Sequence, residues 1–278
     1  MATANGSADM ILVTGGTGKT GRRVAERLKA AGYPVRMGSR SAQPAFDWND
    51  RAGWKAALDG VNAVYVAYQP DLAVPGALET VDAFFDQAVK SGIKKMVLLS
   101  GRGEPEAEAA EDALRKYDVD WTILRSSWFF QNFSESFFLD PLLSDVFALP
   151  VGSIPEPFVD VEDIAEIGAD AFMNARHSRE LYQITGPQAV SFAEAVQEIA
   201  RATKRTIRFK PVSADQYRAE LVQQQVPQDV IDLVLYLLTT VLDGRNTPVC
   251  DGVQRALGRA PRSFTDYVRE TAATGVWG

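Results

Sequence analysis

A glycine-rich segment near the start of the chain carries the first residues whose spacing suggests chemistry. Positions 11–21 read ILVTGGTGKTG, which combines the end of a nucleoside-triphosphate P-loop with the turn of a dinucleotide-binding motif. A P-loop requires a glycine five residues before Gly18, and that position holds Val13. The spacing therefore excludes the P-loop and favours the dinucleotide turn, Gly16-x-Gly18-x-x-Gly21.

Each glycine of this turn has a physical task. Gly15 permits a tight turn after a strand, Gly18 lets the backbone approach the phosphates, and Gly21 lets the following helix pack closely. The amides and the dipole at the start of that helix suit a pyrophosphate. The segment predicts a cofactor-binding set that comprises Gly15, Thr17, Gly18, Lys19, Thr20 and Gly21.

The residues after the second expected strand bear on which nicotinamide dinucleotide is bound. NAD-binding versions place an Asp or Glu about 20 residues after the glycine turn, where it binds the ribose hydroxyls. This chain has Gly38-Ser39-Arg40 at that place, with no acid. An arginine can pair with the 2′-phosphate of NADPH, and a serine can donate a hydrogen bond to it. We therefore expect NADPH as the cofactor, held by Ser39 and Arg40.

Alternating apolar strands and amphipathic helices must position these residues. This alternation predicts an α/β fold with a doubly wound parallel Rossmann sheet, covered by helices on both faces. The expected strands lie at 10–14, 34–40, 44–48, 61–68, 94–101 and 119–126, and the expected helices at 18–31, 51–58, 78–90 and 107–116.

The regular alternation ends near residue 125. We expect 1–9 to be a disordered tail and 10–125 to form the dinucleotide-binding Rossmann core. The mixed region 126–278 is expected to complete the sheet and to form a smaller C-terminal α/β substrate lobe. Within it, the apolar stretch 230–242 can be a core helix, a lid or a homodimer face, and we favour core or lid. The protein is accordingly expected to be a monomer or a homodimer.

Composition excludes several classes of partner. The 278 residues carry a formal net charge of −7 and contain no basic run, so nucleic acid is not expected to bind. One cysteine, Cys250, and one histidine, His177, exclude the common zinc clusters, and no metal is expected. His177 lies in the polar run NARHSRE and is interpreted as a solvated loop residue. The stretch 230–242 is too short to span a bilayer, so we expect a cytoplasmic protein without a membrane partner.

Five blocks of the sequence together resemble the NmrA-like branch of the atypical short-chain dehydrogenase/reductases. The blocks are TGGTGKTG, GSR, VLLSG, DWTILRSSWFFQNF and PFVDVEDIAEIG, and the resemblance runs from about residue 10 to residue 267. It implies a Rossmann domain that binds NADP(H), with a small C-terminal lobe. By the same resemblance, Asp47 and Trp48 border the adenine, and the residues that run beside the cofactor are Ala67, Tyr68 and Gln69.

The resemblance also implies a region near the nicotinamide. It places three serines there, Ser100, Ser126 and Ser127. The aromatic block that follows can be plain core, or it can wall the pocket of a small aromatic or conjugated substrate. We assign part of this block to that pocket, namely Trp128, Phe129 and Phe130.

The chain lacks the proton relay of the parent superfamily, Tyr-x-x-x-Lys. No tyrosine is followed by lysine four positions later, and the helix expected at 107–116 carries Glu108, Glu111 and Asp112 where the pair would stand. Reducing an isolated ketone needs an acid for the developing alkoxide. A conjugated acceptor delocalises the incoming charge and does not need a strong, positioned acid. The catalytic residues are therefore unknown, with Ser100 and Ser127 as weak candidates for the donor.

Two functions from different classes agree with this sequence. The first is an NADPH-dependent reductase, an enzyme that transfers hydride to a conjugated, aromatic acceptor such as a quinone, an enone, an iminium ion or a dye. The second is a non-catalytic regulatory protein that senses NADP(H) and acts through protein contacts. Loss of the relay is compatible with both, and we favour the reductase.

Overall fold

The computed structural model describes residues 9–278, so the expected tail at 1–9 lies almost entirely outside the described residues. The described chain forms two compact units. Residues 164–182 belong to the first unit although they lie beyond residue 125, because they carry most of one helix and of one strand of its sheet. The first unit comprises the N-terminal part up to Gly101 together with Pro105–Arg125 and Ile164–Tyr182. The second unit comprises Arg102–Glu104, Ser126–Asp163 and Gln183–Gly278.

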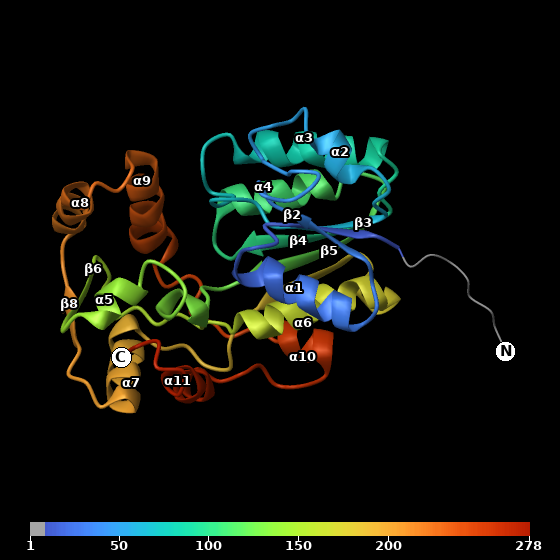
Figure 1. The fold of residues 1–278 in the computed structure, drawn as a ribbon. Helices are drawn as coiled ribbons and strands as arrows, with labels where there is room; N and C mark the ends of the chain where they lie inside the picture. The colour runs from blue at the N-terminus through green and yellow to red at the C-terminus, as the bar shows by residue number, and fades with distance from the viewer. Residues whose placement is uncertain (1–8) are drawn as a thin grey trace. The chain divides into compact units, whose positions relative to one another are not determined.

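A six-stranded sheet forms the centre of the first unit (Figure 1). β1 pairs in parallel with β2 on one side and with β3 on the other, and β3 pairs in parallel with β4. The strand order reverses between β1 and β3, which is where doubly wound sheets bind ligands, outside the carboxyl ends of the strands. The predicted Rossmann sheet is confirmed, in the order β2 (Val35–Gly38), β1 (Ile11–Thr14), β3 (Ala63–Val66), β4 (Lys95–Gly101), β5 (Asp120–Ser126), β7 (Glu180–Ile184).

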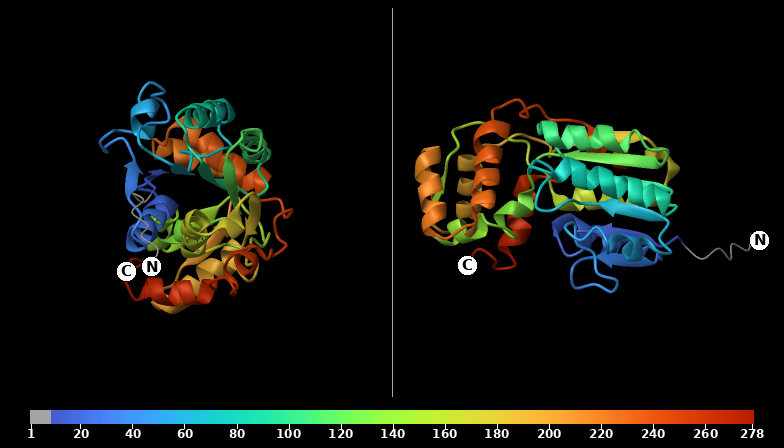
Figure 2. Two further views of the ribbon diagram at one scale, coloured as in Figure 1. Left: turned by 90° about the vertical axis from the view of Figure 1, so that its right-hand side faces the viewer. Right: turned by 90° about the horizontal axis from the view of Figure 1, so that it is seen from above.

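Helices cover both faces of this sheet (Figure 1). α1 (Lys19–Ala30) and α6 (Val161–Met173) lie on one face, and α2 (Trp54–Leu58), α3 (Ala77–Lys90) and α4 (Pro105–Leu114) lie on the other. Seen from above in Figure 2, α3 and α4 run side by side over the strands. The side chains buried beneath these helices include Trp54 and Phe84, whose rings meet edge-to-face at 5.4 Å. Burying one such aromatic side chain contributes roughly 1.5–3 kcal/mol.

The second unit has a small sheet and its own aromatic core. Two parallel strands, β6 (Val146–Leu149) and β8 (Arg208–Pro211), form the sheet. The stretch 230–242 spans most of α9 and a following π-helical turn, and it buries Ile231, Leu235 and Leu238 in this core. The helices of the unit are α5 (Leu139–Leu143), α7 (Phe192–Thr203), α8 (Ala214–Gln223), α9 (Gln228–Tyr236), α10 (Gly252–Leu257) and α11 (Phe264–Ala272).

The strand predicted at 44–48 is wrong. This segment is an irregular loop, and the helix predicted at 51–58 begins only at Trp54. Phe46 and Trp48 are both buried, with their rings 5.0 Å apart and both against Phe84. An irregular loop that buries every second side chain produces the same alternation as a half-buried strand, which is why the pattern misled.

The interpretation of His177 as a solvated loop residue is also wrong. Its side chain is fully buried, with Nδ1 2.9 Å from the Tyr182 hydroxyl and Nε2 2.8 Å from an oxygen of Asp170. The polar neighbours in the sequence hid this burial, because the partners lie on α6 and β7. The imidazole is a satisfied structural group within the first unit.

Candidate functional site

A tight turn joins β1 to α1 and has the geometry expected of a phosphate-binding segment. Gly15 has φ +60°, and its carbonyl oxygen accepts a hydrogen bond from the Gly18 amide at 2.8 Å. A Cβ atom on residue 21 would lie 2.3 Å from that same carbonyl oxygen. A side chain is therefore sterically forbidden at position 21, and the helix approaches the turn as closely as its backbone allows.

The N-terminus of α1 is prepared for an anion. Its N-cap residue is Gly18, no side chain caps the helix, and its first turn, which includes Lys19 and Thr20, contains no acidic residue. Amides left without intrahelical partners, together with the positive end of the helix dipole, attract phosphate groups. The glycine turn and this helix end therefore fit the pyrophosphate of a dinucleotide.

Thr14, which sequence reasoning missed, ties the end of β1 to the end of β3. Its hydroxyl donates to the Tyr65 carbonyl oxygen at 3.1 Å and accepts from the Ala67 amide at 2.9 Å. A Cβ atom on Gly15 would lie 3.3 Å from the Ala67 Cβ, so this tie holds the two segments in close contact. The sequence signal for this role was a polar residue at the end of an otherwise apolar strand.

A pocket of about 370 Å³ opens beside the glycine turn in the first unit. Seven predicted cofactor residues line it, and they come from the turn, the end of β2, the 44–48 loop and the segment after β3. The predicted residues are Gly15, Thr17, Ser39, Arg40, Asp47, Trp48 and Gln69, and those that sequence reasoning missed are Gly38, Phe46, Asn49 and Pro70. Predicted residues outside this lining are Gly18, Lys19, Thr20, Gly21, Ala67 and Tyr68.

Two charged residues, Arg40 and Asp47, line this pocket. Arg40 is exposed at one edge, directly after Ser39 at the end of β2. The Asp47 carboxylate accepts a hydrogen bond from the Asn49 amide at 2.9 Å, which ties it into its own loop. Trp48 is buried and packs against Tyr68 at 5.0 Å. The pocket thus combines a guanidinium and a hydroxyl with an aromatic wall.

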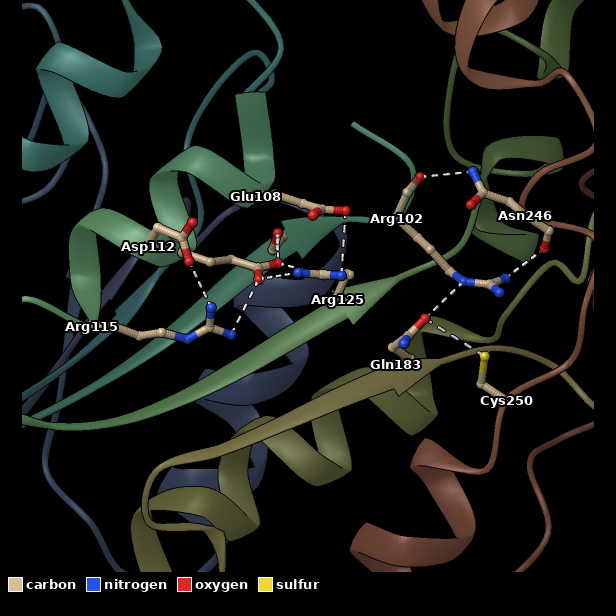
Figure 3. Close-up of polar contacts among 10 residues, drawn as sticks. Arg102, Glu108, Asp112, Arg115, Arg125, Gln183, Asn246 and Cys250 are labelled. Carbon is tan, nitrogen blue, oxygen red and sulfur yellow. Dashed lines mark hydrogen bonds and ion pairs between the residues drawn. The ribbon is translucent and has the colours of Figure 1, made fainter. Parts of the chain in front are cut away.

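α4, the helix that would carry the Tyr-x-x-x-Lys pair of the parent superfamily, holds one side of a buried ion pair instead (Figure 3). Glu111 of α4 is fully buried, and its carboxylate accepts two hydrogen bonds from Arg125 of β5, at 2.8 and 2.5 Å. The Ser100 hydroxyl donates to the same carboxylate at 2.6 Å. These bonds to Glu111 raise the pKa of the Arg125 guanidinium. Ser100 therefore directs its proton at a carboxylate in the first unit.

A second polar cluster lies in the second unit, at the two residues that follow β4 and β5. Arg102 donates to the carbonyl oxygen of Asn246 at 2.6 Å and to Oε1 of Gln183 at 3.3 Å (Figure 3). It also donates to the carbonyl oxygen of Pro248 at 2.8 Å. It also reaches the Ser127 hydroxyl oxygen at 3.4 Å. The guanidinium is largely satisfied by uncharged acceptors, which leaves Ser127 with a weak contact to it.

Glu156 completes this cluster, and sequence reasoning missed it. Its side chain is 1% exposed. Its Oε1 atom finds no hydrogen-bond partner among residues 9–278. Burial raises the pKa of this carboxyl to about 7, although Ser127, Arg102 and the Trp128 amide oppose the shift. The available signal was a carboxylate between two prolines in an apolar run, PEPFV.

Comparison with known proteins decides the family. A model described as NAD(P)H-binding matches residues 15–139. The (4-alkanoyl-5-oxo-2,5-dihydrofuran-3-yl)methyl phosphate reductase of Streptomyces griseus is 31% identical over 286 residues, covering 95% of this chain and 98% of the relative. The chain belongs to the NmrA-like atypical short-chain dehydrogenase/reductases. The resemblance drawn from the motifs is confirmed.

Two further proteins are similar to this NmrA-like chain. The NAD(P)H azoreductase of Xenophilus azovorans is 27% identical, over 95% of this chain and 98% of the relative. The crystal structure of Citrobacter sp. triphenylmethane reductase complexed with NADP(H) has a TM-score of 0.76 at 19% identity, over 94% of this chain and 99% of that one. The NmrA-like protein binds NAD(P)H and is an NAD(P)H-dependent oxidoreductase, as expected.

The aromatic residues assigned to a substrate pocket of the NmrA-like protein differ in burial. Phe130 is 1% exposed and packs against Phe264 and Tyr267 at 5.1 and 5.3 Å. Trp128 and Phe129 are half-buried, and Trp128 stacks on a core phenylalanine. Trp128 and Phe129 are partly exposed residues, whereas Phe130 is enclosed. The assignment of these three residues to a substrate pocket stays a prediction.

Ser126, which the resemblance places near the nicotinamide, is buried. Its carbonyl oxygen accepts a hydrogen bond from the Arg102 amide at 3.1 Å.

Across residues 9–278, every helix falls short of the length and apolarity that crossing a membrane requires.

Proposed function

We propose that this NmrA-like oxidoreductase uses NADPH to reduce conjugated, aromatic acceptors such as quinones, enones, iminium ions or dyes, without a Tyr-x-x-x-Lys relay. The observation that carries the proposal is the buried network of Ser100, Glu111 and Arg125. It fills the region of α4 and β5 where the relay helix would offer a phenol and an ammonium group. An ionised carboxylate–guanidinium pair cannot donate a proton to a developing alkoxide, which disfavours isolated ketones as substrates.

The choice of NADPH rests on the pocket beside β2. Ser39 and Arg40 line it directly after the strand, at the place where NAD-binding relatives of this fold carry an acid. A guanidinium forms paired, charge-assisted hydrogen bonds with a phosphate group, and a ribose hydroxyl offers it no charge to neutralise. The 2′-phosphate of NADPH is therefore the group that this edge of the pocket suits.

In the proposed reaction, the main task of the protein is to position the acceptor and the cofactor. Bound NADPH supplies a hydride, and the chain must hold a flat acceptor in near-attack geometry beside it. Trp128 and Phe129 are partly exposed aromatic residues, which suit a flat, unsaturated partner. The names of the two sequence relatives describe reduction of an unsaturated oxo-dihydrofuran and of azo compounds, which supports an acceptor of this kind.

The test is NADPH oxidation by the purified protein across quinones, enones, azo dyes and cationic dyes. We expect consumption that saturates with at least one of these acceptors. Gly18→Asp should lower it at least 10-fold, because a carboxylate at the start of α1 repels the pyrophosphate. Gly152→Asp is the matched control, since Gly152 has open space around it. NADPH binding without consumption of any acceptor would refute the proposed reaction.

A further inference from the structure

We propose that Trp54, a buried residue outside the cofactor pocket, positions the pocket wall that meets the adenosine part of the cofactor. The first unit builds this wall from the 44–48 loop, which contributes three residues to the pocket lining. Trp54 is 2% exposed and does not belong to that lining, so it acts through the loop rather than on the cofactor itself. The inference rests on the proposed use of NADPH, with Arg40 at the 2′-phosphate.

A hydrogen bond from Trp54 holds the backbone of this loop. The indole Nε1 donates to the main-chain carbonyl oxygen of Asp47 at 2.9 Å. The same oxygen accepts the amide of Asp50 at 3.2 Å, within the turn that follows. Trp54 is the first residue of α2, so its bond ties the pocket residue Asp47 to a helix of the first unit.

An irregular loop depends on such individual bonds more than a strand does. A strand is held by a ladder of backbone hydrogen bonds, whereas residues 44–48 form no strand in the described chain. On the side of β2, the Phe46 amide donates to the Ser39 carbonyl oxygen at 2.9 Å. The loop is thus anchored to the end of β2 at Phe46 and to α2 at the next residue, Asp47.

Trp54 is itself packed in the core, which gives the hydrogen bond a fixed origin. Its ring meets Phe84 of α3 edge-to-face at 5.4 Å and lies 6.2 Å from the ring of Trp48. Phe46 and Trp48 pack on the same Phe84 ring, at 5.5 and 5.1 Å. These apolar contacts are non-directional, whereas a hydrogen bond fixes the direction of a peptide group. The indole N–H therefore sets the orientation of Asp47 at the pocket.

The wall that Trp54 holds meets a part of the cofactor that NADPH and NADH share. Both dinucleotides carry the adenosine, and NADPH alone carries the 2′-phosphate that Arg40 suits. A displaced wall should therefore weaken the binding of both dinucleotides by the same factor. Because this interaction is equal in the ground state and the transition state, its loss raises KM and leaves kcat unchanged. Trp54 is in this sense a positioning residue.

Trp54→Phe tests the proposal, because it removes the N–H group and keeps an aromatic ring. In calorimetric titrations, we expect the Kd values for NADPH, NADH and 2′,5′-ADP to rise by the same factor, about 3- to 10-fold, as for the loss of one hydrogen bond. The kcat at saturating cofactor should change less than about twofold. Trp121→Phe is the matched control, since Nε1 of Trp121 is buried and has no hydrogen-bond partner among residues 9–278. It should leave all three Kd values within about twofold.

The other outcomes of these titrations overturn the proposal. A less stable Trp54→Phe protein with unchanged Kd values would make Trp54 an ordinary core residue. A loss confined to kcat, or to NADPH alone, would contradict its action on the adenosine wall. A wild type that binds NADPH but not 2′,5′-ADP would contradict the assignment of this wall. The titrations need no acceptor, so failure to reduce any acceptor would refute the proposed reaction and leave this inference standing.

If Trp54→Phe fails to fold, hydrogen exchange in the wild type decides. By NMR, the indole N–H of Trp54 should exchange at least threefold more slowly when 2′,5′-ADP is bound, because the ligand suppresses the local opening that breaks this bond. The indole N–H of Trp277 is the control, since it donates to the Phe133 carbonyl oxygen at 2.8 Å within the second unit. Equal slowing of both protons, or of neither, would overturn the proposal.

Discussion

The carbonyl oxygen of Gly15 lies 2.3 Å from the position that a Cβ atom on residue 21 would occupy. The turn that is expected to meet the phosphates and the first turn of α1 are therefore in direct backbone contact. Neither can move without the other, because the Gly15 carbonyl also accepts the Gly18 amide. We therefore expect cofactor affinity and local stability to be coupled at this point.

Gly21→Ala tests this coupling. The added methyl group must push the Gly15 carbonyl away, so we expect a loss of about 1–3 kcal/mol in the free energy of unfolding and a weaker Kd for NADPH. Urea denaturation and fluorescence titration measure the two effects. Gly152→Ala has nothing within 4 Å of its new methyl group and should change both quantities little. A stable Gly21→Ala protein with normal affinity would show that the turn is not so tightly packed.

Arg40→Ala tests the specificity for the cofactor. We expect the KM for NADPH to rise at least 10-fold and the KM for NADH to change less than about twofold, because only NADPH carries the 2′-phosphate. Arg51→Ala, on the exposed loop before α2, provides an arginine control outside the pocket lining. Steady-state kinetics with both cofactors give the answer. Equal effects on the two cofactors would mean that Arg40 does not contact the phosphate.

Glu156 should make the stability of the folded protein depend on pH. Its pKa is about 7 in the folded chain, against 4.5 for the exposed group, so the folded state binds the proton more tightly. This contribution is fully present below pH 4.5 and is lost as the pH rises to about 7, by roughly 3 kcal/mol at most. Denaturation at several pH values should show this decline in the wild type and a shallower one in Glu156→Gln. Identical slopes would mean that the carboxyl group is not perturbed.

Glu111→Gln should destabilise the first unit without acting through chemistry. Removing the buried carboxylate leaves Arg125 with only the half-exposed Glu108, at 3.4 Å, as an ion-pair partner, and we expect a loss of about 3 kcal/mol. Asp112→Asn, on the same helix, breaks an exposed pair with Arg115 and should cost less than about 1 kcal/mol. Thermal and urea unfolding compare the two variants. Similar losses would show that the buried pair contributes no more than a surface one.

Local signals in the chain were sufficient for the sheet and the cofactor turn. Glycines are required where the backbone passes within contact distance of itself, so the order strand, Gly15, Gly18, Gly21, helix predicts the turn directly. Buried parallel strands are continuous apolar runs, which made β1, β3 and β4 recognisable. The 44–48 loop was the exception, because burial of Phe46 and Trp48 copied the alternation of a strand.

Tertiary structure alone decided the environment of the ionisable residues. The sequence by itself determined that His177 is the one histidine and that no tyrosine carries the relay lysine, since both are matters of residue type and spacing. It could not reveal that His177 is buried, or that Glu111 is clamped and Glu156 is not, because their partners lie far away along the chain. The protonation of a carboxyl group depends on burial and on neighbouring charges, and both arise only when distant segments pack together.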